Sequence, residues 1–239
     1  MLPVRLKYQS LLLIICATIS LVLTSCYEET GPVTYPDYTG QIDSIIDIEG
    51  NVYRTIGIGS QIWMAENLRT LKLNNGTVIP QVKDDSDCHY NKTPAYCWYN
   101  NDSVNYSKIY GALYNFYAVS TDSLCPTGWH VPRNSEWTKL INFLGGAEKA
   151  GGKLKDYYTS YWSEPNFCFV NNYGFAALPG GMRQSGGKFI DITTRGYWWT
   201  STSIDDLYAY AFIMFHEKAE ILKIYGLKKE GYSVRCIKD

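Results

Sequence analysis

One triplet in the second half of the chain has residue types that can bind calcium. Glu164-Pro165-Asn166, within the segment SYWSEPNFC, places a carboxylate and an amide on either side of a proline. Calcium takes hard oxygen ligands of this kind, about six to eight at a time. The sequence does not offer enough further ligands, and Pro and Asn favour turns on their own account. We interpret the triplet as a turn and expect no metal and no cofactor.

Aromatic residues crowd around this triplet. Aromatic rings stack on the apolar faces of sugars and also anchor protein interfaces. Tyr197, Trp198 and Trp199 lie further along the chain, and the two tryptophans are equally typical of a core. We therefore predict a ligand site, for a glycan or a protein, in the earlier loop. Its predicted residues are Tyr157, Tyr158, Tyr161, Trp162, Glu164, Asn166 and Phe167.

Catalysis is not expected. His130 has the residue type of a general base, but the sequence contains no recognisable nucleophile motif that would use it. Arg183 and Arg235 could bind an anion. We favour a structural interpretation, in which they bind backbone carbonyls and a carboxylate such as Glu66 or Asp191, because buried arginines rarely go unpaired.

The N-terminus predicts export. Arg5 and Lys7 precede an apolar run from residue 11 to residue 23, which is typical of a signal peptide. Leu23-Thr24-Ser25-Cys26 resembles a lipobox, which implies lipidation of Cys26 and anchoring to outer-membrane lipid. Acids at 28 and 29 resemble a surface-export signal, so we expect an outer-membrane lipoprotein at the cell surface. The predicted parts are a signal peptide (1–25), a lipidated Cys and tether (26–45) and one domain (46–239).

Cysteines of an exported chain are expected to form disulfides. Of the seven cysteines, Cys16 leaves with the signal peptide and Cys26 carries lipid. We favour Cys88–Cys97, which would close a short loop, and Cys125–Cys236, which would tie the middle of the domain to its last strand. The sequence does not fix this connectivity. Cys168 would remain unpaired, as a small buried apolar residue.

Periodicity predicts an α+β domain. Two β-runs flank Gly59-Ser60 as in a hairpin. Apolar residues at helical spacing predict a helix over 135–145 and a weaker one around 113–117, and alternation predicts strands over 208–214 and 232–236. Residues 71–108 are predicted to form an extended loop region, and 151–196 a long irregular one. Composition agrees with a protein that has no nucleic-acid partner, since the net charge is −1.

Six blocks of sequence occur in the order found in one family. The chain resembles the Fibrobacter succinogenes major paralogous domain, common in exported and lipid-anchored proteins of Bacteroidota, from about residue 47 to residue 239. The blocks are YRTIGIGSQIWMAENLRT, YGALYNFYAV, CPTGWHVPRNSEWTKL, GFAALPGGMR, YWWTSTS and GYSVRCIKD.

The resemblance implies a C-type lectin-like fold, with two helices, antiparallel sheets and a long irregular loop region. It also supports Cys125–Cys236, because such domains join a helix region to the last strand. In C-type lectins, the Glu-Pro-Asn triplet works with an Asn-Asp pair after a Trp, whereas Thr200 and Ser201 follow Trp199 here.

The expected function is a surface binding or adhesion module. Two alternatives stay open. One is a structural or assembly subunit of the cell envelope. The other is an enzyme on a scaffold similar to formylglycine-generating enzymes, which would need a reactive thiol at Cys168 or Cys236.

Overall fold

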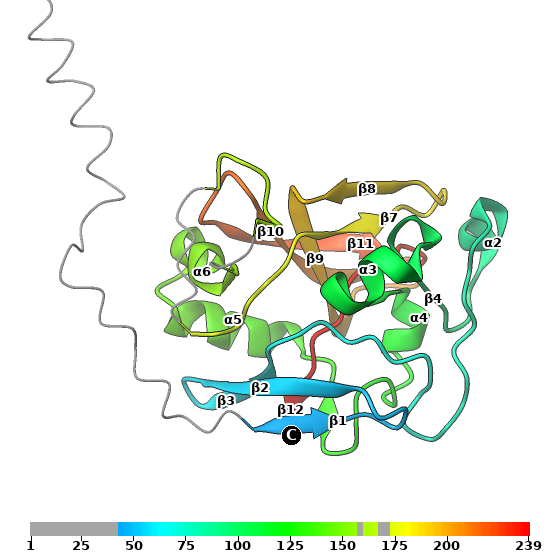
Figure 1. Ribbon diagram of the computed structural model, residues 1–239, viewed down its shortest axis with the longest axis horizontal. Coiled ribbons are helices and arrows are strands. Elements are labelled where there is room, and N and C mark those ends of the chain that lie inside the picture. Colours follow the sequence, from blue (N-terminus) through cyan, green and yellow to red (C-terminus); the bar gives the residue numbers. More distant parts are fainter. Residues whose placement is uncertain (1–42, 157–159, 167–172) are drawn as a thin grey trace, which may run out of the picture. The chain divides into compact units, whose positions relative to one another are not determined.

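A computed structural model of the chain describes residues 43–156, 160–166 and 173–239 (Figure 1). The predicted signal peptide, Cys26 and residues 27–42 of the tether lie outside the described residues. So do three of the predicted ligand residues, Tyr157, Tyr158 and Phe167, and the cysteine expected to stay unpaired, Cys168. Within the three described ranges, no helix is both long enough and apolar enough to cross a bilayer.

The first sheet joins the two ends of the domain. Its strand order is β1-β2-β3-β12-β6, and all its pairings are antiparallel. The predicted hairpin is confirmed, with Gly59 at φ 61° in the turn between β2 and β3. Strand β1 begins two residues before the predicted domain boundary. The strands are β1 (Ser44–Ile46), β2 (Val52–Ile58), β3 (Gln61–Met64), β6 (Trp129–His130) and β12 (Ile237–Lys238).

The second sheet has the order β11-β10-β9-β7-β8, and only β7 and β9 pair in parallel. The predicted strand over 208–214 is confirmed as β10, whereas 232–236 forms bridges, not a continuous strand. The strands are β7 (Gly180–Arg183), β8 (Phe189–Ile192), β9 (Arg195–Ser203), β10 (Tyr208–Phe215) and β11 (Ile221–Leu227), beside a small pair, β4 (Tyr96–Cys97) and β5 (Leu113–Tyr114).

The α+β class is confirmed, but the prediction of two helices is wrong. The described residues form α2 (Asp85–Tyr90), α3 (Ser103–Tyr110), α4 (Phe116–Val119), α5 (Asn134–Phe143) and α6 (Ala147–Leu154), with a 3₁₀ turn at Tyr99–Asn101. Helix α5 was expected. Helix α4 overlaps the weaker helix predicted around 113–117, where β5 takes the first two residues. The predicted loop regions hold α2, most of α3 and the second half of α6. Helices α3 and α4 start at capping side chains, Asp102 and Asn115.

Helix α6 was missed because its glycines look like breakers. Gly151 lies against the turn after β10, where an added Cβ would lie 2.5 Å from the Glu220 carbonyl oxygen. A larger residue would push the helix off the sheet, so glycine here permits close packing.

Strands β9 and β10 separate two apolar clusters. Trp198, Phe212 and Met214 face α5 and α6, whereas Trp199 and Ile213 face the opposite side, as alternation along strands requires. Both tryptophans are fully buried. The core interpretation of this pair is therefore confirmed.

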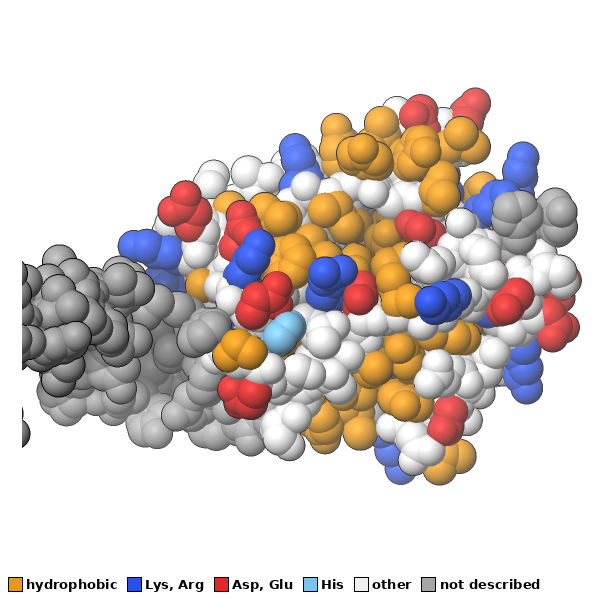
Figure 2. Space-filling view, turned by 90° about the horizontal axis from the view of Figure 1, so that it is seen from above, with side chains coloured by type: hydrophobic (Ala, Val, Ile, Leu, Met, Phe, Trp, Pro, Cys, Tyr) orange, Lys and Arg blue, Asp and Glu red, His pale blue; other side chains and the backbone are white. Residues whose placement is uncertain are grey.

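The outer face of the second sheet carries apolar side chains. Seen from above, hydrophobic side chains lie among charged ones on this side of the domain (Figure 2). Four half-buried residues from β8, β10 and β11 belong to it, and we call them the apolar band: Ile190, Phe215, Leu222 and Ile224.

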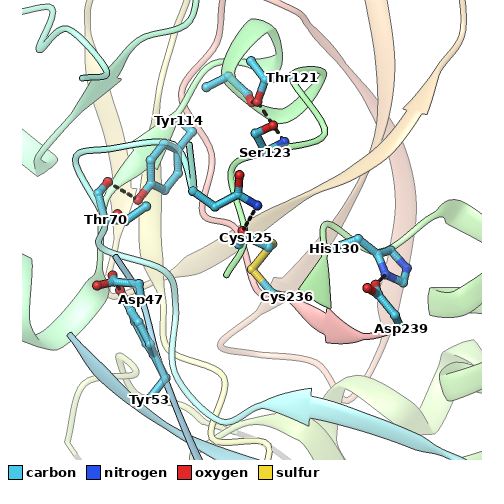
Figure 3. The surroundings of a disulfide bond; sticks show 12 residues. Asp47, Tyr53, Thr70, Tyr114, Thr121, Ser123, Cys125, His130, Cys236 and Asp239 are labelled. Carbon is cyan, nitrogen blue, oxygen red and sulfur yellow. Dashed lines mark hydrogen bonds and ion pairs between the residues drawn. A yellow bond between two sulfur atoms is a disulfide. The ribbon is translucent and has the colours of Figure 1, made fainter. Parts of the chain in front are cut away.

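One predicted disulfide forms and the other does not. Cys125 and Cys236 are bonded, with Cα atoms 6.0 Å apart and 111 residues between them in sequence (Figure 3). Cys88 and Cys97 are free, buried thiols, which corrects the predicted Cys88–Cys97 bond. Cys88 donates to the Gln184 carbonyl at 3.5 Å, and Cys97 packs in a small cluster with Tyr99 and Leu113.

Candidate functional site

The Glu164-Pro165-Asn166 triplet, which resembles a calcium-binding motif, already contacts a cation of the protein itself, the ammonium of Lys155. The Glu164–Pro165 peptide is cis, and the Glu164 carboxylate accepts the Asn166 backbone N–H at 3.1 Å. The Asn166 side-chain oxygen accepts a hydrogen bond from the Lys155 ammonium at 3.1 Å. Among the described residues, no group of three or more His, Cys, Asp or Glu side chains converges as a metal site.

Three backbone carbonyls also surround this ammonium. Phe215, His216 and Lys218, at the turn between β10 and β11, lie 2.8, 3.1 and 2.9 Å from Lys155 Nζ. We call these three carbonyls, the Asn166 side-chain oxygen and the adjacent Trp162 ring the lysine cage. Asn166 is only 9 % exposed, so it does not offer its amide to an external ligand.

The predicted aromatic site is only partly exposed. Trp162 is 3 % exposed and donates its indole N–H to the Ala177 carbonyl at 3.0 Å. Tyr161 is half-buried, with its ring centroid 5.7 Å from that of Tyr110 in an edge contact. Of the predicted ligand residues that the structure describes, Tyr161 and Glu164 retain access to solvent. Trp162 and Asn166 are corrected to structural roles, because the helix end and the β10–β11 turn enclose them.

His130 lies between two carboxylates. Its Nδ1 lies 2.6 Å from Asp239 Oδ1 (Figure 3). Its Nε2 lies 3.0 Å from both Glu136 oxygens. Ionised carboxylates only accept hydrogen bonds, so a ring nitrogen that carries a proton donates it to the carboxylate that it faces. This arrangement ties the last residue of the chain to α5 and leaves neither nitrogen directed at a substrate.

The two arginines have the predicted structural role. Arg183 donates to the carbonyls of residues 82, 83 and 187, and Arg235 donates to the Phe175 carbonyl and to Asn67 Oδ1. The carboxylate partners suggested by the sequence are wrong. Arg183 pairs with Asp85 at 3.2 Å, whereas Glu66 and Asp191 pair with other arginines.

A cavity between Cys88, Cys97 and Arg183 has a volume of only about 20 Å³. That is room for about one water molecule. Burial raises the pKa of the Cys97 thiol to about 12, with the Arg183 guanidinium opposing the shift, and raises that of Cys88 too. Thiols in this state are poor nucleophiles at neutral pH.

A larger pocket lies where several loops meet at one end of the second sheet. Its volume of about 510 Å³ is in the range of ligand sites, roughly 300–1,000 Å³. It combines an apolar floor with hydroxyl, ammonium and carboxylate groups. We call it the loop-end pocket, and its residues are Lys92, Tyr117, Ser185, Asp206, Leu207, Leu227 and Lys229.

Hydrogen bonds hold the walls of the loop-end pocket in place. Lys228 N–H donates to the Leu207 carbonyl at 2.8 Å, and its own carbonyl accepts from Phe116 N–H at 2.9 Å. The Asp205 carboxylate accepts the backbone N–H groups of Leu207 and Tyr208 at 2.8 and 2.7 Å. The β9–β10 turn, the start of α4 and the turn after β11 are thus joined directly.

The charged groups of the loop-end pocket are available to a ligand. Within the described part of the chain, neither Lys92 nor Lys229 forms an ion pair through its ammonium. Burial raises the pKa of Tyr117, which keeps its hydroxyl protonated as a hydrogen-bond donor. Sequence reasoning missed this pocket because its residues come from five separate segments, none of which has a motif.

The comparisons with known proteins identify a family but no characterised relative. A family model described as the Fibrobacter succinogenes major domain matches residues 56–238. No curated protein and no solved structure matches the chain.

Proposed function

The chain belongs to the Fibrobacter succinogenes major domain family, and from this premise we propose that its domain is a non-catalytic binding module for a glycan or protein ligand. The loop-end pocket is the observation that carries the proposal. It has the volume of a ligand site, walls fixed by hydrogen bonds and mixed apolar and polar groups. This site replaces the 157–167 loop as the main candidate.

The chemistry of the loop-end pocket suits a sugar. Leu207, Leu227 and the Tyr117 ring offer apolar surface to the C–H face of a pyranose. Lys92, Lys229 and Ser185 can bond its hydroxyl or acidic groups. No metal is needed for this mode of binding.

We also propose that the module has a C-type lectin-like fold and is carried on a lipoprotein anchored through Cys26 at the cell surface. The α+β domain, with its ends joined in one sheet, supports the fold. The apolar run before Cys26 supports the anchor. A Cys26→Ala variant should appear in the soluble fraction instead of the membrane fraction, and retention in the membrane would contradict the lipid anchor.

The proposed function is tested by profiling the full chain on a glycan array, with calcium and with a chelator. We expect binding that the chelator leaves unchanged and that Tyr117→Ala combined with Lys229→Ala abolishes. Lys139→Ala, an exposed lysine on α5, is the matched control and should bind normally. Binding lost on chelation, or kept by the double variant, would contradict the assignment of the site.

A second function is favoured by the apolar band. These side chains pack against the core cluster and remain partly open to solvent, and apolar surface left open in this way can contact another protein. An envelope assembly subunit would therefore retain a stoichiometric partner when purified in mild detergent. This second function would be favoured if no glycan on the array binds and such a partner co-purifies with the chain. The partner should then be lost when Leu222 is changed to Asp.

A further inference from the structure

Lys155 has an unusual position for a lysine. It directly follows α6, where its ψ of 148° turns the chain away from the helix axis. Its relative exposure is 0 %, although lysine is almost never fully buried without partners. The side chain therefore runs inward, into the lysine cage.

The oxygens of the cage are arranged as around a bound cation. Four oxygens from two other segments lie 2.8–3.1 Å from Nζ. The Trp162 ring, whose centroid is 5.2 Å from Nζ, adds the electron-rich face of an indole. An ammonium has three N–H donors, so these acceptors provide the hydrogen bonds that its burial requires.

The charge of the cage selects the kind of cation. The four oxygens that the described residues contribute are three backbone carbonyls and one amide, all uncharged. Calcium sites usually include carboxylates and about six to eight ligands. Carbonyl oxygens, in contrast, can replace the hydration shell of a monovalent ion such as potassium.

We infer that the lysine cage is a monovalent-cation site in which the ammonium of Lys155 is the permanent occupant. It links the end of α6, the segment 160–166 and the β10–β11 turn through one charge. The Glu164-Pro165-Asn166 turn is thereby fixed without metal. Removal of the side chain should leave a site that a small alkylammonium or potassium ion can enter.

Two variants of the full chain test this inference. Lys155→Ala removes the ammonium and leaves space, whereas Lys155→Met removes the charge and fills the space. Both should melt lower by on the order of 10 °C, because buried oxygens lose their partner. Lys153→Ala, two residues earlier on α6, is the matched control and should melt near the wild-type temperature.

Cation rescue distinguishes the cation site from ordinary packing. Ethylammonium chloride, and more weakly potassium chloride, should raise the melting temperature of Lys155→Ala in a saturable way. Choline at the same ionic strength is too large to enter and should not. Lys155→Met and the wild type should not respond to any of these salts. Equal responses to choline and ethylammonium, or a Lys155→Met variant as stable as the wild type, would overturn the inference.

A measurement on the wild type covers the case in which the alanine variant does not fold. Amine-acetylating reagent applied to the native chain should modify Lys139 and Lys229 rapidly and leave Lys155 unmodified until unfolding, as read by mass spectrometry. Asn166→Ala, which removes a single oxygen, should lower the melting temperature by less than Lys155→Met. Acetylation of Lys155 at the rate of the exposed lysines would overturn the inference.

Discussion

The lysine cage and the loop-end pocket both contain lysines, but their ammonium groups meet opposite surroundings. Lys155 is bonded to oxygens of the protein on several sides. Lys92 and Lys229 border a pocket of about 510 Å³ and form no ion pair within the described residues. The hydrogen bonds of the Lys155 ammonium go to the protein and hold the fold. The ammonium groups of Lys92 and Lys229 are left to bond a ligand.

This difference shows why residue type alone misleads in a search for sites. The triplet and the aromatics around 160–167 have the chemistry of a binding site, yet the chain itself uses Asn166 and Trp162 for support. The residues of the loop-end pocket have no such signature. What separates the two regions is whether the polar groups are already paired inside the protein.

The largest expected loss of unfolding free energy comes from removal of the disulfide, and the other predicted losses are compared with it. Replacing Cys125 and Cys236 by alanine opens a loop with a sequence separation of 111 residues. In the chain-entropy model, this should cost about 4–5 kcal/mol of unfolding free energy. Urea unfolding of the variant and of the oxidised wild type measures this loss. The lysine cage and the loop-end pocket should lose stability together. A loss confined to one region would show that the two regions unfold separately.

Truncation of the ring in the lysine cage should come next. Trp162→Ala removes a large buried side chain and the indole beside Lys155, so we expect a loss of about 3–5 kcal/mol in unfolding free energy. Ligand affinity at the loop-end pocket, measured where the variant is still folded, should not change. Tyr225→Ala, at a ring that is 69 % exposed, is the control and should lose little stability. Lost ligand binding with unchanged stability would restore Trp162 as a contact residue.

Long periodic segments of the fold were predictable from the sequence. Helix α5 has apolar residues at 137, 140, 141 and 144, and β10 alternates, so local pattern and burial agree. The hairpin at Gly59 and the Cys125–Cys236 bond were also predicted correctly. The resemblance to the family supplied what the periodicity did not: the order of the blocks and the expected ends of the domain.

Other features depend on contacts that no local pattern encodes. Helix α6 contains Gly151 because a carbonyl approaches it from the β10–β11 turn. The Cys88–Cys97 prediction failed although both thiols line one small cavity, because closeness in sequence does not ensure the geometry of a disulfide. The lysine cage joins residues 155, 166 and 215–218, and the loop-end pocket joins five segments. Only the folded chain brings these together.

Pocket variants should change ligand binding but hardly affect stability. Lys92→Ala and Lys229→Ala remove exposed or half-exposed ammonium groups without described ion pairs, so the unfolding free energy should stay within about 0.5 kcal/mol. Ligand affinity should fall about tenfold or more for each charge-assisted bond lost, as bonds worth about 1.5–3 kcal/mol imply. Calorimetric titration with a ligand found on the array measures this, with Lys139→Ala as control. A stability loss as large as that of Lys155→Met would show that these lysines are also structural.

The smallest effect concerns a carboxyl group beneath the loop-end pocket. Burial raises the pKa of Glu230 above its ordinary value of 4.5, against the opposing hydrogen bonds from Tyr232 Oη and Leu227 N–H. The folded chain therefore holds this proton more tightly than the unfolded chain. The associated stability is full below the ordinary pKa and is lost as the pH rises through the folded value.

Glu230→Gln keeps an acceptor for both hydrogen bonds but cannot ionise. The variant should match the wild type in acid and become slightly more stable than the wild type toward neutral pH, because only the wild type must bury a charge there. Urea unfolding at about pH 5 and about pH 8 measures the difference between the two chains. If Glu230→Gln is instead destabilised more at neutral pH than in acid, the ionised carboxylate contributes to holding the Leu227–Glu230 turn. The wall of the loop-end pocket would then depend on a buried charge, as the lysine cage does.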